Sequence, residues 1–227
     1  MIRTLTAAIA ATTLLAVPTA LSAQSTPKPA PRTAPRQPRS VQVGGFALFG
    51  NVDFTATQSF DTIVGKHAGP LLGGGARVGL PWGGLFAEVG AWRFHARGER
   101  VFLSQGTRYP LGITDTINVT PIEISAGWQF RIRRLRSFTP YVAGGYTSLR
   151  YQESSDFSAS GEDVDQNFGG YHFRAGAEYK VIRWIGVAAE VQATSVPNAI
   201  GQGGVSKTFA ESSLGGRQLR LKITIGR

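Results

Sequence analysis

Three histidines, His67, His95 and His172, are the residues of this chain best suited to acid–base chemistry, and they stand far apart in the sequence. A histidine beside a serine could activate that serine as a nucleophile, because imidazole can accept the hydroxyl proton near neutral pH. None of the three is followed two residues later by serine. A triad assembled from distant residues stays open, because triads are defined by geometry and not by order. We expect all three histidines to be structural, with His172 among interior polar groups.

Five acidic residues gather in one stretch that could bind a cation: Glu153, Asp156, Glu162, Asp163 and Asp165. The run from Asp163 to Asn167 imitates the opening of a calcium loop. Phe168 occupies the position that requires glycine, however, and Arg174 stands where the bidentate glutamate should be. An EF-hand is therefore excluded, and we expect a solvated acidic loop with no metal. Loose cation bridging to an anionic surface is the alternative.

Two further motifs can be weighed in the same way. The glycine run from Gly73 to Gly79 lacks the spacing and the Lys-Ser/Thr ending of a phosphate loop, so it predicts close strand packing. A group of arginines could contact anionic lipid headgroups or be ordinary surface charge: Arg131, Arg133, Arg134 and Arg136. We expect no cofactor.

The composition limits which elements can position these side chains. The chain has 227 residues and no cysteine, so disulfides and thiolate chemistry are excluded. It has 29 glycines and only 17% charged residues, which disfavours helical bundles and disorder. The net charge is +10, but five of the 24 basic residues lie in the first forty residues, leaving 19 against 14 acidic residues. No basic stripe with interleaved aromatic residues follows, so we expect no nucleic-acid partner.

The first forty residues do not belong to the fold that we expect. Residues 1–23 combine Arg3, a short apolar run and small residues before Ala23, which predicts a secretory signal peptide cleaved there. Residues 24–40 alternate proline with basic residues and predict an extended linker. No later stretch is long and apolar enough for a membrane-spanning helix.

From Val41 onward, apolar and polar residues alternate with the period of half-apolar β-strands, in eight segments. The segments match the roughly 9 to 11 residues that cross a bilayer at a tilt. In the first segment we expect one apolar face that holds Phe46, Leu48, Val52, Phe54 and Ala56.

The connections alternate in length. Long connections are expected at 58–69, 98–115, 153–167 and 197–215, with short turns at 81–84, 133–138 and 182–184. This asymmetry is typical of an outer-membrane barrel with short periplasmic turns and long extracellular loops. The fold class predicted is thus all-β, an eight-stranded antiparallel up-and-down transmembrane barrel over 41–227, with the 24–40 linker in the periplasm.

Either face of such a barrel could point outward. With the apolar face inside, the barrel would be a ligand-binding cup; with it outside, the barrel would face lipid. Glycines on the polar face and aromatic residues near strand ends favour lipid outside. The expected aromatic girdle is Trp82, Tyr141 and Trp184 by the turns, with Phe54, Tyr151, Phe168 and Tyr171 toward the loops. The expected interior polar network is Arg77, Glu88, Glu123, Arg174, Glu178, Glu190 and Arg220.

The stretches 138–146 and 170–179 and the closing strand from Gln218 to Ile225 resemble the bacterial outer-membrane β-barrel domain family, the eight-stranded relatives of the OmpA transmembrane domain, OmpW and Ail-like proteins. The resemblance covers 41–227. It implies an outer-membrane location, contact with outer-membrane lipids and lipopolysaccharide, and folding by the barrel-assembly machinery. Family members commonly end in an aromatic residue that this machinery reads, whereas this chain ends in Arg227.

We therefore expect an envelope module, and not an enzyme, that acts through its four extracellular loops on a ligand that the sequence does not name. The first alternative is a passage for small solutes through the polar interior. The second is a lipid-modifying enzyme, although the His-x-Ser pairing of lipid A deacylases is absent.

Overall fold

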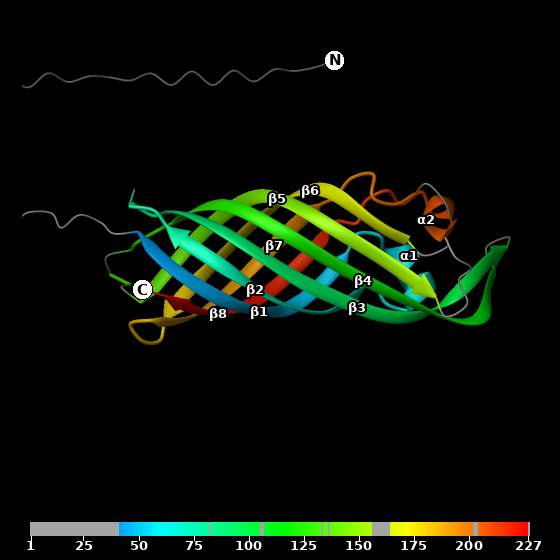
Figure 1. Ribbon diagram of the computed structural model, residues 1–227, viewed down its shortest axis with the longest axis horizontal. Coiled ribbons are helices and arrows are strands. Elements are labelled where there is room, and N and C mark those ends of the chain that lie inside the picture. Colours follow the sequence, from blue (N-terminus) through cyan, green and yellow to red (C-terminus); the bar gives the residue numbers. More distant parts are fainter. Residues whose placement is uncertain are drawn as a thin grey trace, which may run out of the picture. The chain divides into compact units, whose positions relative to one another are not determined.

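The computed structural model describes residues 41–81, 83–104, 107–132, 134–135, 137–155, 164–201 and 204–226. They form β1 (Gln42–Phe54), α1 (Thr57–Val64), β2 (Ala68–Gly79), β3 (Leu85–Ser104), β4 (Thr107–Gln129), β5 (Phe138–Ser155), β6 (Val164–Lys180), β7 (Ile185–Ser195), α2 (Gly204–Thr208) and β8 (Gly216–Gly226). Consecutive strands pair antiparallel, and β1 pairs with β8, so the sheet closes (Figure 1). The predicted eight-stranded antiparallel barrel is confirmed. Within the described residues, neither helix is long and apolar enough to cross a membrane.

The two ends of the barrel differ in their connections. The end that holds the C-terminus of β8 has short turns, and in the β2–β3 turn Gly83 and Gly84 have φ of 77° and 145°, which favour glycine. The opposite end carries α1 and α2 (Figure 1). We call these the short-turn end and the long-connection end.

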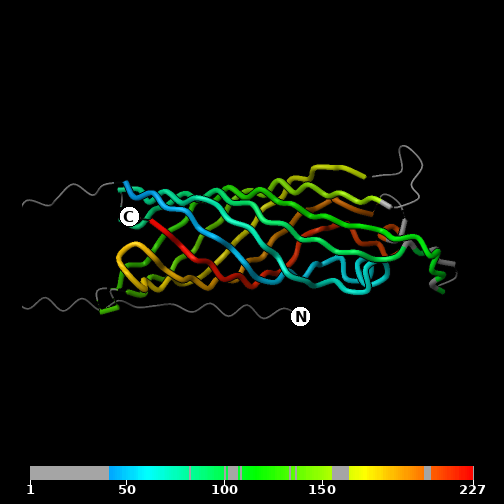
Figure 2. The backbone as a smooth tube through the Cα atoms, turned by 60° about the horizontal axis from the view of Figure 1, so that its bottom comes forward, coloured from blue at the N-terminus to red at the C-terminus, as the bar shows by residue number. Residues whose placement is uncertain are grey.

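The expected loop at 98–115 is wrong. The chain there continues β3 and β4 as a paired hairpin, from Gly98 opposite Asp115 to Ser104 opposite Thr107, with one register shift between Glu99 and Val101. Figure 2 shows this hairpin continuing past α1. The two arms satisfy each other's backbone hydrogen bonds, so the hairpin can extend beyond the other strands of the barrel.

The apolar residues of most strands face outward, as the alternation predicts. We call these outward residues the apolar belt, and its large exposed members include Leu72, Val89, Ile122, Ile124, Tyr171, Phe173, Val187, Val191, Leu219, Leu221 and Ile223. Between them lie inward polar residues such as Glu123, Arg174 and Arg220, all buried. A closed sheet with this polarity places its apolar surface against lipid.

The apolar face predicted for β1 is present, but the outward direction expected for it is wrong. Phe46, Leu48, Val52 and Phe54 are buried and face inward, whereas Asn51 and Asp53 are exposed. Inside the barrel, Phe46 occupies space that the glycines of β2 and β3 leave open, because a Cβ at Gly75 would lie 2.6 Å from its ring. The alternation of apolar and polar residues defines the two faces of a strand, but it does not show which face points into the barrel.

The polarity of the barrel also reverses along its length. On β3 the outward residues change from Val89 and Ala91 to Arg93, His95 and Arg97, while Trp92 and Phe94 become buried inside. The part of the barrel near the long connections therefore has an apolar interior and a polar exterior, the arrangement that water outside requires.

Four members of the expected aromatic girdle are corrected. Phe54, Tyr141 and Tyr151 are buried inside the barrel, because each lies on the inward pleat of its strand. Phe168 also lies on the inward pleat and packs against the cluster that contains Phe54 and Tyr151. Tyr171 and Trp184 are exposed, at 70% and 53%. The outward aromatic residues near the short-turn end are instead Trp128, Phe130, Phe138 and Tyr179.

Several expectations fall on residues outside the described ranges. They are the signal peptide at 1–23, the linker at 24–40, Trp82, Arg133, Arg136, Asp156, Glu162, Asp163 and the terminal Arg227.

Candidate functional site

A set of charged side chains fills the middle of the barrel, and we call it the charged ladder. Four acidic and four basic residues compose it: Glu88, Glu123, Glu178, Glu190, Arg77, Arg174, Arg220 and Lys222. The structure places all seven residues of the expected interior network in it. Lys222 was missed, although it lies on the same pleat of β8 as Arg220.

The ladder begins near the short-turn end with Arg77. Its Nε donates to Glu88 Oε2 at 2.8 Å and its Nη1 donates to Glu178 Oε2 at 2.9 Å. The guanidinium lies 4.7 Å from the ring centre of Phe86 and 5.0 Å from that of Tyr141. These rings and carboxylates close the interior at this level.

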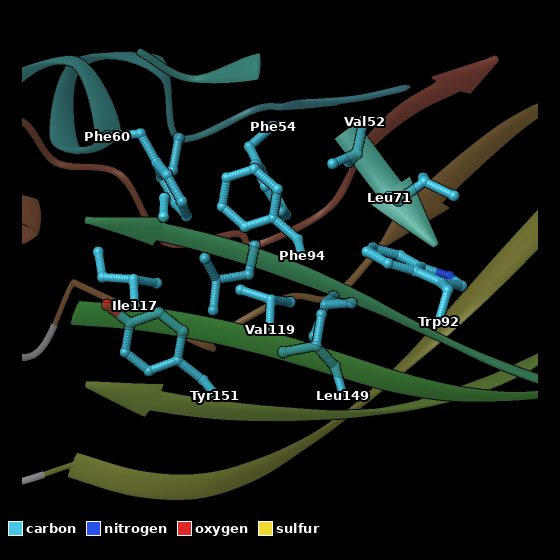
Figure 3. Packing of buried hydrophobic residues seen from close by; sticks show 14 of the residues in the cluster. Val52, Phe54, Phe60, Leu71, Trp92, Phe94, Ile117, Val119, Leu149 and Tyr151 are labelled. Atoms are coloured by element: carbon cyan, nitrogen blue, oxygen red, sulfur yellow. The ribbon is translucent and has the colours of Figure 1, made fainter. Parts of the chain in front are cut away.

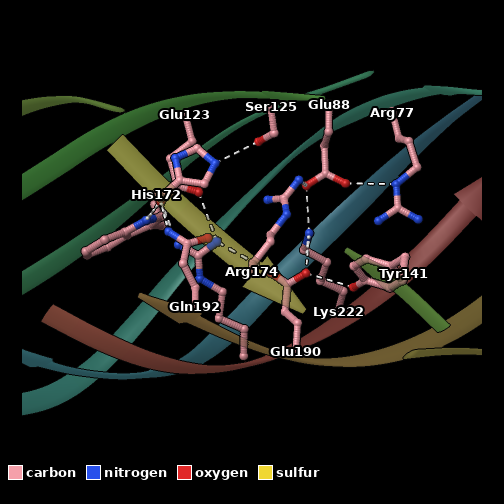
Figure 4. Close-up of polar contacts among 12 residues, drawn as sticks. Arg77, Glu88, Glu123, Ser125, Tyr141, His172, Arg174, Glu190, Gln192 and Lys222 are labelled. Atoms are coloured by element: carbon pink, nitrogen blue, oxygen red, sulfur yellow. Dashed lines mark hydrogen bonds and ion pairs between the residues drawn. The ribbon is translucent and has the colours of Figure 1, made fainter. Parts of the chain in front are cut away.

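Glu88 and Glu190 share a cation in the middle of the ladder. Lys222 Nζ donates to Glu88 Oε1 at 2.7 Å and lies 3.0 Å from Glu190 Oε2 (Figure 4). Arg174 Nη2 lies 2.7 Å from Glu88 Oε1, and the Tyr141 hydroxyl donates to Glu190 Oε2 at 2.7 Å. Tyr141 is thus part of the interior, not of the membrane interface.

The ladder ends at Glu123. Arg220 donates to both of its carboxylate oxygens, at 2.7 and 2.9 Å. Trp92 Nε1 and Gln192 Nε2 also donate to Glu123 Oε1, at 2.9 and 2.7 Å. Gln192 and Trp92 extend the network to uncharged groups, which sequence alternation alone does not pair.

Register explains why opposite charges meet. Arg77 lies directly opposite Glu88, and Glu190 directly opposite Arg220, on neighbouring strands. Because all of these side chains lie on the inward pleat, the cross-strand pairs converge on the barrel axis. A buried charge without a partner is costly, and here four acidic and four basic side chains balance each other's charge inside the barrel.

His172 forms the arrangement that most resembles a catalytic group. Its Nε2 lies 2.9 Å from Ser125 Oγ and its Nδ1 lies 2.8 Å from Thr147 Oγ1. In a hydrolase triad the second ring nitrogen contacts a carboxylate, which stabilises the imidazolium; here a hydroxyl takes that place. All three side chains are buried between strands. The arrangement therefore fits a structural hydrogen-bond chain.

An apolar layer closes the barrel on the side of the long connections. It includes Phe54, Phe94, Ile117, Val119 and Leu149 (Figure 3). Helix α1 adds Phe60, whose ring stacks on Phe54 at 4.5 Å between centres. A Cβ at Gly98 would lie 2.1 Å from the carbonyl oxygen of Ile63, so α1 also packs directly on β3.

Above the apolar belt, β3 presents a basic stripe, which we define as Arg93, His95 and Arg97. Arg93 Nη2 donates to Asn118 Oδ1 at 2.7 Å, and His95 Nδ1 lies 2.8 Å from the same oxygen. Among the described residues, no carboxylate forms an ion pair with this stripe. The stripe therefore offers positive charge to the outside.

The remaining acidic and histidine candidates lie at the long-connection end. Asp165 pairs with Arg150, which lowers the pKa of the Asp165 carboxyl, and Glu153 accepts a hydrogen bond from Tyr151. The hydrogen bond to Asp61 raises the pKa of His67 above its usual value. Across the ranges that the structure covers, no three acidic or histidine side chains are grouped to hold a metal.

Two cavities lie on opposite sides of the charged ladder. The larger, about 890 Å³, lies at the short-turn end and is bounded by Arg77 and Glu178. The smaller, about 310 Å³, lies beside α1 and is bounded by Phe60, Ile117 and Leu214. Within the described ranges, the two cavities share no lining residue, which agrees with an interior closed between them.

Comparison with known proteins gives one family match. The model of the outer membrane protein beta-barrel domain matches residues 7–217. No curated protein matches the chain.

Several solved structures are similar to this chain. The N-terminal β-barrel domain of Pseudomonas aeruginosa OprF is 11% identical, with 82% of this chain and 97% of that chain covered and a TM-score of 0.48. Neisserial surface protein A is 13% identical, with coverages of 82% and 96% and a TM-score of 0.49. Ail of Yersinia pestis, in complex with the heparin analogue sucrose octasulfate, is 10% identical, with coverages of 82% and 98% and a TM-score of 0.41.

Proposed function

The chain belongs to the outer membrane protein beta-barrel domain family, and from this premise we propose that it is a closed anchor that presents an interaction surface outside the cell. The outer membrane is its location. We propose that the short-turn end faces the periplasm and the long-connection end faces the exterior, the usual sidedness of such barrels.

The observation that carries this proposal is the double closure of the interior. The charged ladder fills the middle of the barrel, from Glu178 to Glu123, with direct ion pairs. The apolar layer under α1 closes the next level, where Phe54 and Phe60 stack. A solute would have to break ion pairs and then cross a dry layer. This supports an anchor over a passage.

The part that projects from the membrane supports a role in surface interaction. The β3–β4 hairpin extends past α1 and is held by its own backbone pairs. The basic stripe lies at the start of this extension, where the outward face changes from Ala91 to Arg93. At that level it would meet the phosphates of lipopolysaccharide, and each basic residue near an anionic membrane surface adds about 1 kcal/mol.

We further propose the steps that bring the chain to this location. Residues 1–23 act as a signal peptide, residues 24–40 form a periplasmic linker, and the barrel-assembly machinery inserts the barrel. Each of these three steps is independent of the closed interior.

Reconstitution into planar bilayers tests the proposal. The purified protein is expected to give no conductance steps under conditions in which a bilayer-active porin gives them. Reproducible steps would establish the solute passage instead. Hydrolysis of lipid by the wild-type protein that is lost in His172→Gln would establish an enzyme.

The outer surface needs its own test. Binding to lipopolysaccharide-coated beads is expected to weaken in the Arg93→Gln, Arg97→Gln double variant. Arg134→Gln, which removes an exposed cation at the opposite end, is the control and should bind like the wild type. Equal binding by all three proteins would contradict a role for the stripe.

A further inference from the structure

The cavity at the short-turn end has the size and opening of a binding site. Its volume of about 890 Å³ lies within the usual range of small-molecule pockets, about 300–1,000 Å³. Its closed end is formed by the Arg77–Glu178 ion pair, and its mouth is formed by the turns around Leu135 and Arg183. A ligand would enter from the short-turn side alone.

The cavity exists because glycine replaces larger residues on the inward pleat. Gly44, Gly79, Gly186 and Gly226 line it. One level deeper on the same strands, the inward residues include Phe46 and Arg77, which fill the barrel. Glycine generally destabilises the interior of a strand. Here each of four strands has a glycine, and therefore no side chain, at an inward position beside the cavity.

The charge of the cavity is positive. Arg131, Lys180 and Arg183 line its mouth, and none of them forms an ion pair with a carboxylate in the part of the chain that the structure describes. The acidic side chain among the described lining residues is Glu178, and it is neutralised by Arg77 at 2.9 Å.

The rest of the wall offers hydrogen bonds. Gln42, Gln129, Thr139 and Thr224 line the cavity with amide and hydroxyl groups. Such walls suit a hydrophilic body better than an acyl chain, because buried polar groups need partners. Most of the apolar lining residues lie on the outward pleat of their strands or in the short turns at the mouth, and Phe46 packs at the closed end. Val43, Phe138, Ile185 and Ile225 are on the outward pleat, and Ile132, Leu135, Ile182 and Trp184 are in the turns.

Charge also decides against the chain's own N-terminal segment as the occupant. That segment leads directly into Gln42 at the cavity, but residues 24–40 contain four basic residues and no acidic residue. Like charges repel, so residues 24–40 do not match the charge of the cavity mouth.

We propose that this cavity binds a small hydrophilic molecule that carries two or more phosphate or carboxylate groups. The proposal uses the proposed sidedness only to name the periplasm as the source of this ligand. The binding itself does not depend on the proposed anchor function. An anionic lipid headgroup shares the same chemistry and is the alternative source, which the test must separate.

Calorimetry on the full-length mature chain in phosphatidylcholine nanodiscs tests the proposal, with tetraglutamate peptide as the probe and tetralysine as its control. Tetraglutamate is expected to bind and tetralysine is not. Arg131→Gln and Lys180→Gln should each weaken binding about fivefold, since each charge contributes about 1 kcal/mol. Arg217→Gln, which removes a cation at the opposite end, should leave binding unchanged.

A matched pair of glycine variants separates the cavity from its charged mouth. Gly79→Leu fills the cavity, and its Cβ would meet Gln42 only at ordinary contact distance, 3.4 Å. Gly144→Leu makes the same change on the outward face of β5, away from the cavity, with its Cβ 3.5 Å from His172 O. Both variants should keep heat-modifiable gel migration, and only Gly79→Leu should abolish binding.

Two results would overturn the proposal. One is the absence of tetraglutamate binding by the wild-type protein. The other is binding that Gly79→Leu leaves intact but phosphatidylglycerol in the nanodiscs abolishes, because the mouth would then hold lipid headgroups and the cavity nothing. Conductance in planar bilayers would contradict the anchor function without affecting either result.

Discussion

The carboxylate of Glu211 accepts a hydrogen bond from the backbone N–H of Ser59 at 2.8 Å, although the two residues are separated by most of the barrel in sequence. The same carboxylate accepts from Gln58 N at 3.0 Å. Helix α1 has no side-chain cap of its own, because Ala56 stands at its N-cap. The β7–β8 connection therefore supplies both the missing cap and a negative charge at the positive end of the helix.

Removing that cap should loosen α1. Glu211→Ala is expected to cost about 1 kcal/mol locally, so amide exchange over 57–64 and trypsin cleavage after Lys66 should both accelerate. Glu99→Ala is the control, because the Glu99 carboxylate accepts its hydrogen bond from Gly112 N in the hairpin. Equal exchange in both variants would contradict the capping role.

Breaking the charged ladder should destabilise the barrel more than breaking an exposed pair. Glu190→Gln removes a carboxylate that faces Lys222 and Arg220, and leaving buried cations short of a partner is expected to cost about 3–5 kcal/mol. Asp165→Asn breaks the exposed pair with Arg150 and should cost less than about 1 kcal/mol. Urea unfolding in lipid vesicles, followed by tryptophan fluorescence, measures both.

A charge in the apolar belt should be far more costly than one above it. Leu221 is 50% exposed in the middle of the outward run of β8, so Leu221→Arg is expected to cost about 2–4 kcal/mol. Thr114→Arg, on the outward pleat of β4 in the extension, should cost little because the site is exposed and lies opposite Glu99. The same unfolding assay compares them, and similar costs at both sites would mean that the belt is misplaced.

The His67–Asp61 contact should depend on pH. The Asp61 hydrogen bond, aided by the charges of Asp61 and Asp53, raises the pKa of His67 above 6.5 against a smaller effect of burial. A raised pKa means that the contact stabilises the fold fully below pH 6.5 and that this stabilisation is lost as pH rises through the pKa of the folded state. Titration of the His67 ring signals by NMR should show the raised value, and Asp61→Asn should lower it. An unchanged midpoint in that variant would contradict the assigned cause.

The sequence by itself determined the strand periodicity, and from it the closed eight-stranded barrel. Where one face was uniformly apolar, as from Tyr171 to Tyr179 on β6 or from Leu219 to Ile225 on β8, the direction of that face was also correct. Seven residues of the charged ladder could be predicted from this direction, because a charged side chain on the opposite pleat of such a strand must lie inside the barrel. Glycine and other turn-forming residues also predicted the short connections, because the conformation of a tight turn depends on the residues within it.

Only the tertiary structure decided what lies on each side of a strand at a given height. Along the far halves of β1 and β3 the surroundings change, with water outside and the apolar layer inside, so Phe54 and Phe94 face inward. The alternation of apolar and polar residues cannot predict this reversal. It shows that the two faces of a strand differ, but not whether each face contacts lipid, water or the barrel interior. Tyr141, Lys222 and Glu211 found their partners through barrel closure, which brings together residues that no spacing in the sequence relates.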